Sequence, residues 1–270
     1  MRTGYDGAVI FLEANDRQLL LPSALLQKTG FGDVSSTYGD ATVSADVSTD
    51  DWPFFYMPRR VYPVSYLVMV GLVLVLSLFI FFRFLDGRPQ FGTAPFFFLG
   101  AGFMLIETKA ITELGLVFGN SWQVIGIAII AILIMAFLAN LAVRRYKIER
   151  SSMTYLLLLF SLAIGWWVAH SGGLPSGWLG RIGLAIVLTS PIFFSGILFS
   201  TLLRSRGAIS GMMAMNLLGA MCGGLLEYNS MYFGFQFLYL LAAGLYVGAL
   251  LSELVASRPI VESVLTAGAK

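Results

Sequence analysis

Seven stretches of this chain are apolar over lengths that suit the crossing of a lipid bilayer. A hydrocarbon core about 30 Å thick needs about 20 helical residues, and only helices and closed barrels satisfy their backbone amides inside it. The stretches are, approximately, 64–82, 96–118, 122–143, 153–169, 180–203, 208–226 and 231–252. The sequence therefore predicts an all-α polytopic membrane protein, a bundle of about six to seven transmembrane helices.

Composition supports the same class. Hydrophobic residues make up 57% of the chain and charged residues 12%, with a mean hydropathy of +0.81, far from soluble-domain averages. A net charge of +2 is too small to indicate nucleic-acid binding. The single cysteine, Cys222, lies in an apolar run, so a disulfide or a cysteine-based metal site within one chain is excluded. We expect no metal site, and the lipid bilayer as the surrounding medium.

The chain divides into unequal parts. Residues 1–62 are polar and mixed, and they predict a short strand at 8–12, a helix at 23–30 and a loop at 35–46. We interpret them as a soluble remnant, the end of a larger domain. Residues 63–255 form the multi-pass transmembrane domain, and 256–270 form a carboxyl-terminal tail.

Basic residues are distributed unevenly over the loops. The most basic loop, 144–150, should be cytoplasmic by the positive-inside rule. If all seven stretches cross the membrane, ten basic residues share its side and Arg59, Arg60 and Arg181 lie opposite. If 96–118 instead enters and returns, the count is again ten to three. Charge alone therefore leaves both topologies open.

One phrase just before the first apolar stretch carries a resemblance. It consists of Thr49, Asp50, Asp51, Trp52, Pro53 and Phe54, and a second phrase runs from Phe98 to Lys109, with Phe118 and Gly119 beyond it. Together they resemble spermidine synthase-like proteins, particularly the large bacterial ones in which an aminopropyltransferase-like Rossmann domain is fused to multi-pass membrane segments. The resemblance implies a membrane domain located in the bacterial cytoplasmic membrane.

The residues that would make such a protein an enzyme do not appear. The family holds its donor nucleotide on a glycine-rich turn about a hundred residues before the Asp-Asp phrase, and Gly100–Gly102 mimics that turn only inside an apolar run. We therefore expect no cofactor and no catalysis by this chain on its own. Asp50 and Asp51 are interpreted as structural residues near the domain exit, with a base or a cation site as the alternative.

The stretch 96–118 contains three ionisable groups, and such groups in a membrane are usually buried in a bundle and paired. Lys109 and Glu113 are four residues apart on one helix face and can form an ion pair. Glu107 projects about 160° away from Lys109 and needs a partner elsewhere.

The candidate partners are Asn140, Asn216 and Glu227, of which the last two share one helix face. Glu107 is then either part of a polar clamp that fixes helix packing or a carboxylate that handles protons or cations. A further alternative is that the position assigned to residues 96–118 within the membrane is wrong.

Two other patterns concern packing. Small residues at Gly207, Gly211, Gly219 and Gly223 predict the close approach of another helix. Pro191 should kink its helix, with the hydroxyls of Thr189 and Ser190 available to the freed carbonyls.

Two functions remain in play. The first is a membrane domain that accompanies a spermidine synthase-like protein, either anchoring it or handling a small substrate, for which a cation is one option. Its partner would be a Rossmann-type catalytic domain or a copy of the chain itself. The alternative is an independent small-solute transporter or channel subunit that uses the intramembrane carboxylate Glu107.

Overall fold

The structure is a computed structural model, and the chain divides after Asp46. The structure describes residues 46, 48–54, 56–57, 59–84, 91–119, 122–146, 151–171, 177–205 and 209–267. Apart from Asp46, these belong to the part that begins at Val47. The strand, helix and loop predicted between residues 8 and 46 lie outside the described residues, except for Asp46. The predicted division into domains stays a prediction.

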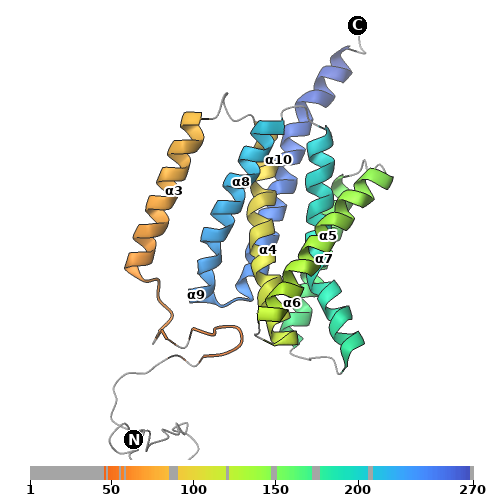
Figure 1. The fold of residues 1–270 in the computed structure, drawn as a ribbon. Helices are drawn as coiled ribbons and strands as arrows, with labels where there is room; N and C mark the ends of the chain where they lie inside the picture. Colours follow the sequence, from red (N-terminus) through yellow and green to blue (C-terminus); the bar gives the residue numbers. More distant parts are fainter. Residues whose placement is uncertain are drawn as a thin grey trace, which may run out of the picture. The chain divides into compact units, whose positions relative to one another are not determined.

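The described part is helical and has no strand (Figure 1). Its long helices are α3 (Val64–Phe84), α4 (Ala94–Phe118), α5 (Trp122–Tyr146), α6 (Ser151–Ser171), α7 (Trp178–Ser205), α8 (Ile209–Leu226) and α10 (Phe237–Ala267). Two 3-10 turns, η1 (Phe91–Thr93) and η2 (Glu227–Asn229), and the short helix α9 (Ser230–Phe233) complete it. Six helices are long and apolar enough to cross a membrane, so the predicted helical polytopic bundle is confirmed.

Consecutive long helices run in alternate directions (Figure 1). α4 is continuous over 25 residues, or about 37 Å at ~1.5 Å per residue. Pro95 suits the first turn of α4, where a backbone amide has no partner within the helix. The helix ends at Gly119, whose φ of +101° is unfavourable for a residue with a side chain. A helix that does not turn back agrees with crossing and not with a re-entrant segment.

α4 lies at the centre of the bundle, between α8, α10, α7 and α5. More than half of the most apolar part of α4 is buried inside the bundle, whereas the corresponding share is 17% for α5 and for the span Ile209–Phe233 that contains α8. The main core joins Phe96, Leu105 and Ala110 of α4 to residues of α6, α7 and α10. Its position explains how one helix can hold several polar groups away from lipid.

Glycines bring α8 against α4. A Cβ on Gly219 would collide with the backbone of Phe97, and one on Gly223 with the backbone of Ala101. The predicted close approach is therefore confirmed at these two positions. Gly211 has open space around it, and Gly207 lies outside the described residues.

The proline in α7 has the hydrogen-bond pattern expected from the sequence. Pro191 cannot donate to the carbonyl four residues earlier, that of Val187, and the Ser190 hydroxyl donates to this oxygen at 2.7 Å. The Thr189 hydroxyl donates to the Ala185 carbonyl, also at 2.7 Å.

The start of the last long helix was predicted wrongly. A continuous apolar run suggested a helix from residue 231, but α9 ends at Phe233 and α10 starts at Phe237. Gly234, with φ of +89°, breaks the run. Hydrophobicity alone does not register such a turn, because its other neighbours, Gln236 apart, are as apolar as the residues within the helices.

Candidate functional site: a carboxylate-lined cavity at one end of the bundle

The described residues of 48–62, here called the anchor segment, are attached to the α9–α10 connection. The side chain of Trp52 is fully buried, and its Nε1 donates to the Met231 carbonyl at 2.7 Å. The Phe54 ring stacks on that of Phe235 with centroids 5.7 Å apart. Thus part of the phrase that carries the family resemblance packs directly on the membrane helices.

Asp51 supports the turn before α10. Its carbonyl accepts from the Phe235 amide at 2.8 Å, and its Oδ1 accepts from the Gln236 amide at 2.6 Å. A carboxylate at the start of a helix also interacts favourably with the helix dipole. A Cβ on Gly234 would collide with the Asp51 carboxylate, so the close approach requires glycine. These contacts agree with the structural role expected for Asp51.

Tyr62 makes a further attachment at the end of the anchor segment. Its hydroxyl donates to Asn229 Oδ1 at 2.9 Å, and its ring stacks on Tyr232 at 5.5 Å. Burial, followed by the neighbouring Tyr232, raises the pKa of the Tyr62 phenol. A raised pKa keeps this hydroxyl protonated, and hence a donor, throughout the physiological pH range.

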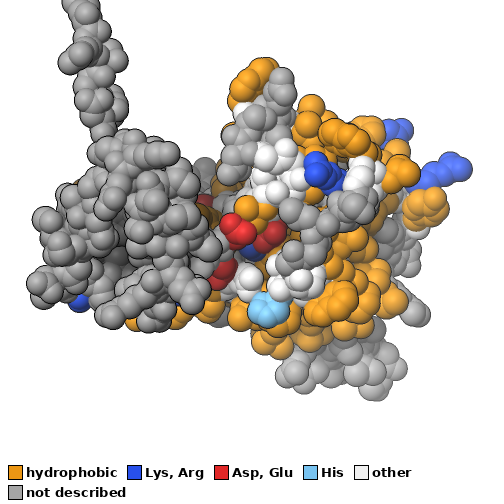
Figure 2. Space-filling view, turned by 90° about the horizontal axis from the view of Figure 1, so that it is seen from below, with side chains coloured by type: hydrophobic (Ala, Val, Ile, Leu, Met, Phe, Trp, Pro, Cys, Tyr) orange, Lys and Arg blue, Asp and Glu red, His pale blue; other side chains and the backbone are white. Residues whose placement is uncertain are grey.

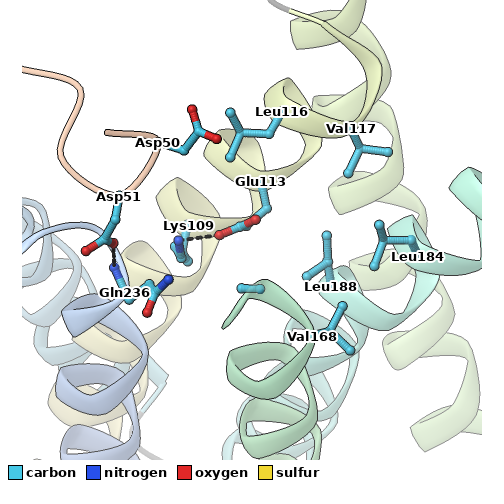
Figure 3. A pocket seen from close by; sticks show the side chains of 11 residues that line it. Asp50, Asp51, Lys109, Glu113, Leu116, Val117, Val168, Leu184, Leu188 and Gln236 are labelled. Atoms are coloured by element: carbon cyan, nitrogen blue, oxygen red, sulfur yellow. Dashed lines mark hydrogen bonds and ion pairs between the residues drawn. The ribbon is translucent and has the colours of Figure 1, made fainter. Parts of the chain in front are cut away.

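A cavity of about 190 Å³ opens beside these contacts (Figure 3). It is formed by the anchor segment, α4, α6, α7 and the start of α10. Its lining consists of Asp50, Asp51, Lys109, Glu113, Leu116, Val117, Val168, Ala169, Leu184, Leu188 and Gln236. Figure 2 shows acidic side chains gathered among hydrophobic ones at this end of the bundle, which we call the acidic end.

The predicted pair of Lys109 and Glu113 is present, as an ion pair on one face of α4 (Figure 3). Lys109 is almost completely buried, and Glu113 is 9% exposed. Lys109 Nζ lies 5.3 Å from the centroid of the Tyr239 ring and 6.0 Å from that of Phe235, within the range of cation–π attraction. Each charge of this pair is therefore compensated inside the bundle.

The charges of the cavity do not balance. Asp50, Asp51 and Glu113 supply three carboxylates, and among the described lining residues Lys109, already paired with Glu113, is the only cation. Asp50 is exposed, and the described part shows no hydrogen bond to its side chain. Among the described residues, no group of three His, Cys, Asp or Glu side chains could hold a metal ion. The excess of carboxylates among the described lining residues makes this cavity electronegative.

The other predicted polar residues lie elsewhere. Thr108 Oγ1 donates to Glu227 at 3.0 Å, so Glu227 connects η2 to α4. Glu107 is half-buried on α4, and no hydrogen bond in the described part joins it to Asn140, Asn216 or Glu227. Whether Glu107 is a packing clamp or a functional carboxylate stays a prediction.

Asn140 and Asn216 come together at a second cavity, of about 240 Å³, nearer the opposite end of the bundle. That end carries the carboxyl ends of α3, α5 and α7, and we call it the basic end because Arg83, Arg144, Arg145 and Arg204 lie there (Figure 1). Two serines that the sequence analysis did not select, Ser195 and Ser200, line the same cavity.

Gln236 is a further residue of the acidic end that the sequence analysis missed. Its amide is held by Asp51, and its side-chain Oε1 lies 3.1 Å from Nδ1 of His170. The His170 ring in turn stacks on Trp166. A lone glutamine inside the predicted apolar stretch 231–252 was a visible signal, but its place at the cavity depends on the turn at Gly234.

No protein-family model, no curated protein and no solved structure matches this chain.

Proposed function

We propose that this chain is a multi-pass membrane protein that binds a small organic cation in the cavity at its acidic end. The observation that carries the proposal is the lining: three carboxylates face a volume of about 190 Å³, and the single lysine among them is already paired. A primary ammonium group would donate to Asp50 and to the free oxygens of the other acids, with its carbon chain against Leu116 and Leu184.

The role of the cavity within a larger process is part of the same proposal. A membrane domain of a spermidine synthase-like protein would either anchor the catalytic part or handle its substrate, and an amine-sized anionic cavity favours handling. Asp50 and Asp51 come from the phrase that resembles the end of the catalytic domain. A cation passing between such a domain and the membrane would therefore meet these two carboxylates first.

Binding of amines to the purified full chain in lipid nanodiscs tests the proposal. We expect spermidine and 1,4-diaminobutane to bind and glutamate not to bind. Asp50→Asn removes one charge without breaking a hydrogen bond of the described structure. It should weaken amine binding by up to about fivefold, because a partly solvated charge interaction contributes up to ~1 kcal/mol.

The matched control is Glu253→Gln, which removes a carboxylate far from the cavity, where Glu253 accepts from Ser151 Oγ at 2.6 Å. Its amine affinity should equal that of the unmodified chain. Equal affinity of Asp50→Asn and the unmodified chain, or binding of glutamate as tight as that of the amines, would contradict the proposal. Glu113→Gln is less suitable as a first variant, since it leaves Lys109 buried and unpaired.

A further inference from the structure

The outer surface of the bundle carries a groove between α5 and α7, toward the basic end. The groove has a volume of about 550 Å³, and we call it the outer groove. It shares no lining residue with either of the two cavities described above. Its lining consists of Leu138, Leu141, Ala142, Arg145, Tyr146 and Phe193.

The packing of α5 on α7 explains why a groove forms here. Five of the six lining residues recur at three- and four-residue spacing, which places them on one face of α5, and Phe193 comes from α7. The two helices approach closely beside the groove, where a Cβ on Gly196 would lie 2.9 Å from the Cβ of Ala139. The small side chain of Ala142 then leaves a hollow between the larger groups around it.

The outer groove is basic at one end and apolar along the rest. Arg145 and Tyr146 belong to the last turn of α5, and both side chains are exposed. An exposed tyrosine at a helix end is typical of the level of the lipid headgroups. Leu138 precedes Arg145 by seven residues, so the apolar part reaches about 10 Å deeper into the hydrocarbon at ~1.5 Å per residue. This arrangement complements an amphipathic anion.

The cation at the mouth of the groove is available to a ligand. In the described part of the chain, the side chains of Arg144 and Arg145 make no ion pair and no hydrogen bond. At the same end, by contrast, Glu253 accepts from the Ser151 hydroxyl at 2.6 Å. A guanidinium presents its donors in a planar fork that matches two oxygens of a phosphate group. The positive-inside rule predicts that this end is cytoplasmic, and the cytoplasmic leaflet is the one with a negative surface potential from anionic lipids.

We propose that the outer groove binds one anionic phospholipid, with its phosphate on Arg145 and an acyl chain against Leu138, Leu141 and Phe193. Each CH₂ group buried in the groove adds affinity that a free phosphate ion lacks. A zwitterionic lipid would bring its own ammonium close to the two arginines, and like charges repel. The site lies at the opposite end of the bundle from the amine cavity and does not depend on the proposed function.

Lipid competition on the purified full chain in detergent, read by native mass spectrometry, tests the proposal. The probes are phosphatidylglycerol and phosphatidylcholine with identical acyl chains, offered in equal amounts, and the readout is the ratio of the two one-lipid adducts. Arg145→Gln removes the guanidinium of the groove. Arg204→Gln is the matched control, because Arg204 lies in the last turn of α7 at the same end but does not line the groove.

A second pair of variants tests the apolar part without changing any charge. Ala142→Trp fills the hollow of the groove. Ala131→Trp is its control, since Ala131 is also half-buried on α5 but lies outside the lining of the groove. We expect Ala142→Trp to reduce the fraction of the chain that carries one lipid, and Ala131→Trp to leave that fraction unchanged.

We expect phosphatidylglycerol to exceed phosphatidylcholine about fivefold on the unmodified chain and on Arg204→Gln, and the ratio to fall to about one on Arg145→Gln, because one basic residue near an anionic membrane surface contributes about this factor. Equal ratios for Arg145→Gln and Arg204→Gln would overturn the proposal in favour of a general attraction to the basic end. Equal lipid retention by Ala142→Trp and the unmodified chain would overturn the groove as the binding site. Release of the lipid by millimolar inorganic phosphate, or a second copy of the chain retained in place of lipid, would overturn the phospholipid as the occupant.

Discussion

At the residue scale, the turn before α10 depends on the backbone conformation of Gly234. Its φ of +89° disfavours any side chain, and a Cβ there would also collide with the Asp51 carboxylate. We expect Gly234→Ala to lower the free energy of unfolding by about 1–3 kcal/mol, measured as thermal unfolding of the purified protein.

Gly224→Ala is the matched control for this change. Gly224 lies in α8 with open space where its Cβ would be, and alanine favours a helix by up to about 1 kcal/mol over glycine. If Gly224→Ala and Gly234→Ala changed the unfolding temperature in the same direction and by the same amount, the turn at Gly234 would have no specific effect on stability.

The residue scale also shows where sequence reasoning succeeds. The pair of Lys109 and Glu113 could be predicted because helix geometry places residues four apart on one face. The meeting of Asp50 with Glu113 at one cavity could not, because it depends on how the anchor segment packs on the turn at Gly234. Local spacing predicts contacts within a helix, whereas contacts between distant segments need the tertiary structure.

At the scale of elements, the packing of α8 on α4 predicts different effects for glycines of one helix. Gly219→Ala places a Cβ onto the Phe97 backbone, whereas Gly211→Ala places one in open space. Overpacking should cost Gly219→Ala about 1–3 kcal/mol, and Gly211→Ala should be neutral or slightly stabilising. Thermal unfolding in one detergent compares them, and equal stability of the two variants would contradict the observed packing.

The elements themselves were largely predictable. Each of the seven apolar stretches corresponds to a long helix, since backbone hydrogen bonding in lipid leaves few other structures. The second cavity was not predictable, because Ser195 and Ser200 are single hydroxyls in an apolar run. Serines of this kind often bond only to their own helix, as Ser195 does, and nothing local distinguishes Ser200, whose hydroxyl donates to Asn140 on α5.

At the scale of the whole molecule, the alternating directions of the long helices decide which loops share an end of the bundle. With alternating helices, the count of ten basic residues against three predicts that the basic end is cytoplasmic and the acidic end external. In intact cells with a Cys222→Ser background, an impermeant thiol reagent should label Tyr56→Cys, at the acidic end.

The complementary position is Ser152→Cys, at the start of α6 and the basic end. It should be labelled only after the membrane is permeabilised. Labelling of Ser152→Cys and protection of Tyr56→Cys in intact cells would reverse the orientation and place the carboxylate-lined cavity on the cytoplasmic side.

The attachment of the anchor segment has a consequence for sequence divergence. Trp52 and Asp51 bind the carbonyl of Met231 and the amides of Phe235 and Gln236, all of them main-chain atoms. Every amino acid except proline offers the same atoms. The side chains of Met231 and Gln236 are therefore free to vary among related sequences without loosening these hydrogen bonds, whereas Gly234 is not. An alignment of relatives should show an invariant glycine within an otherwise variable turn.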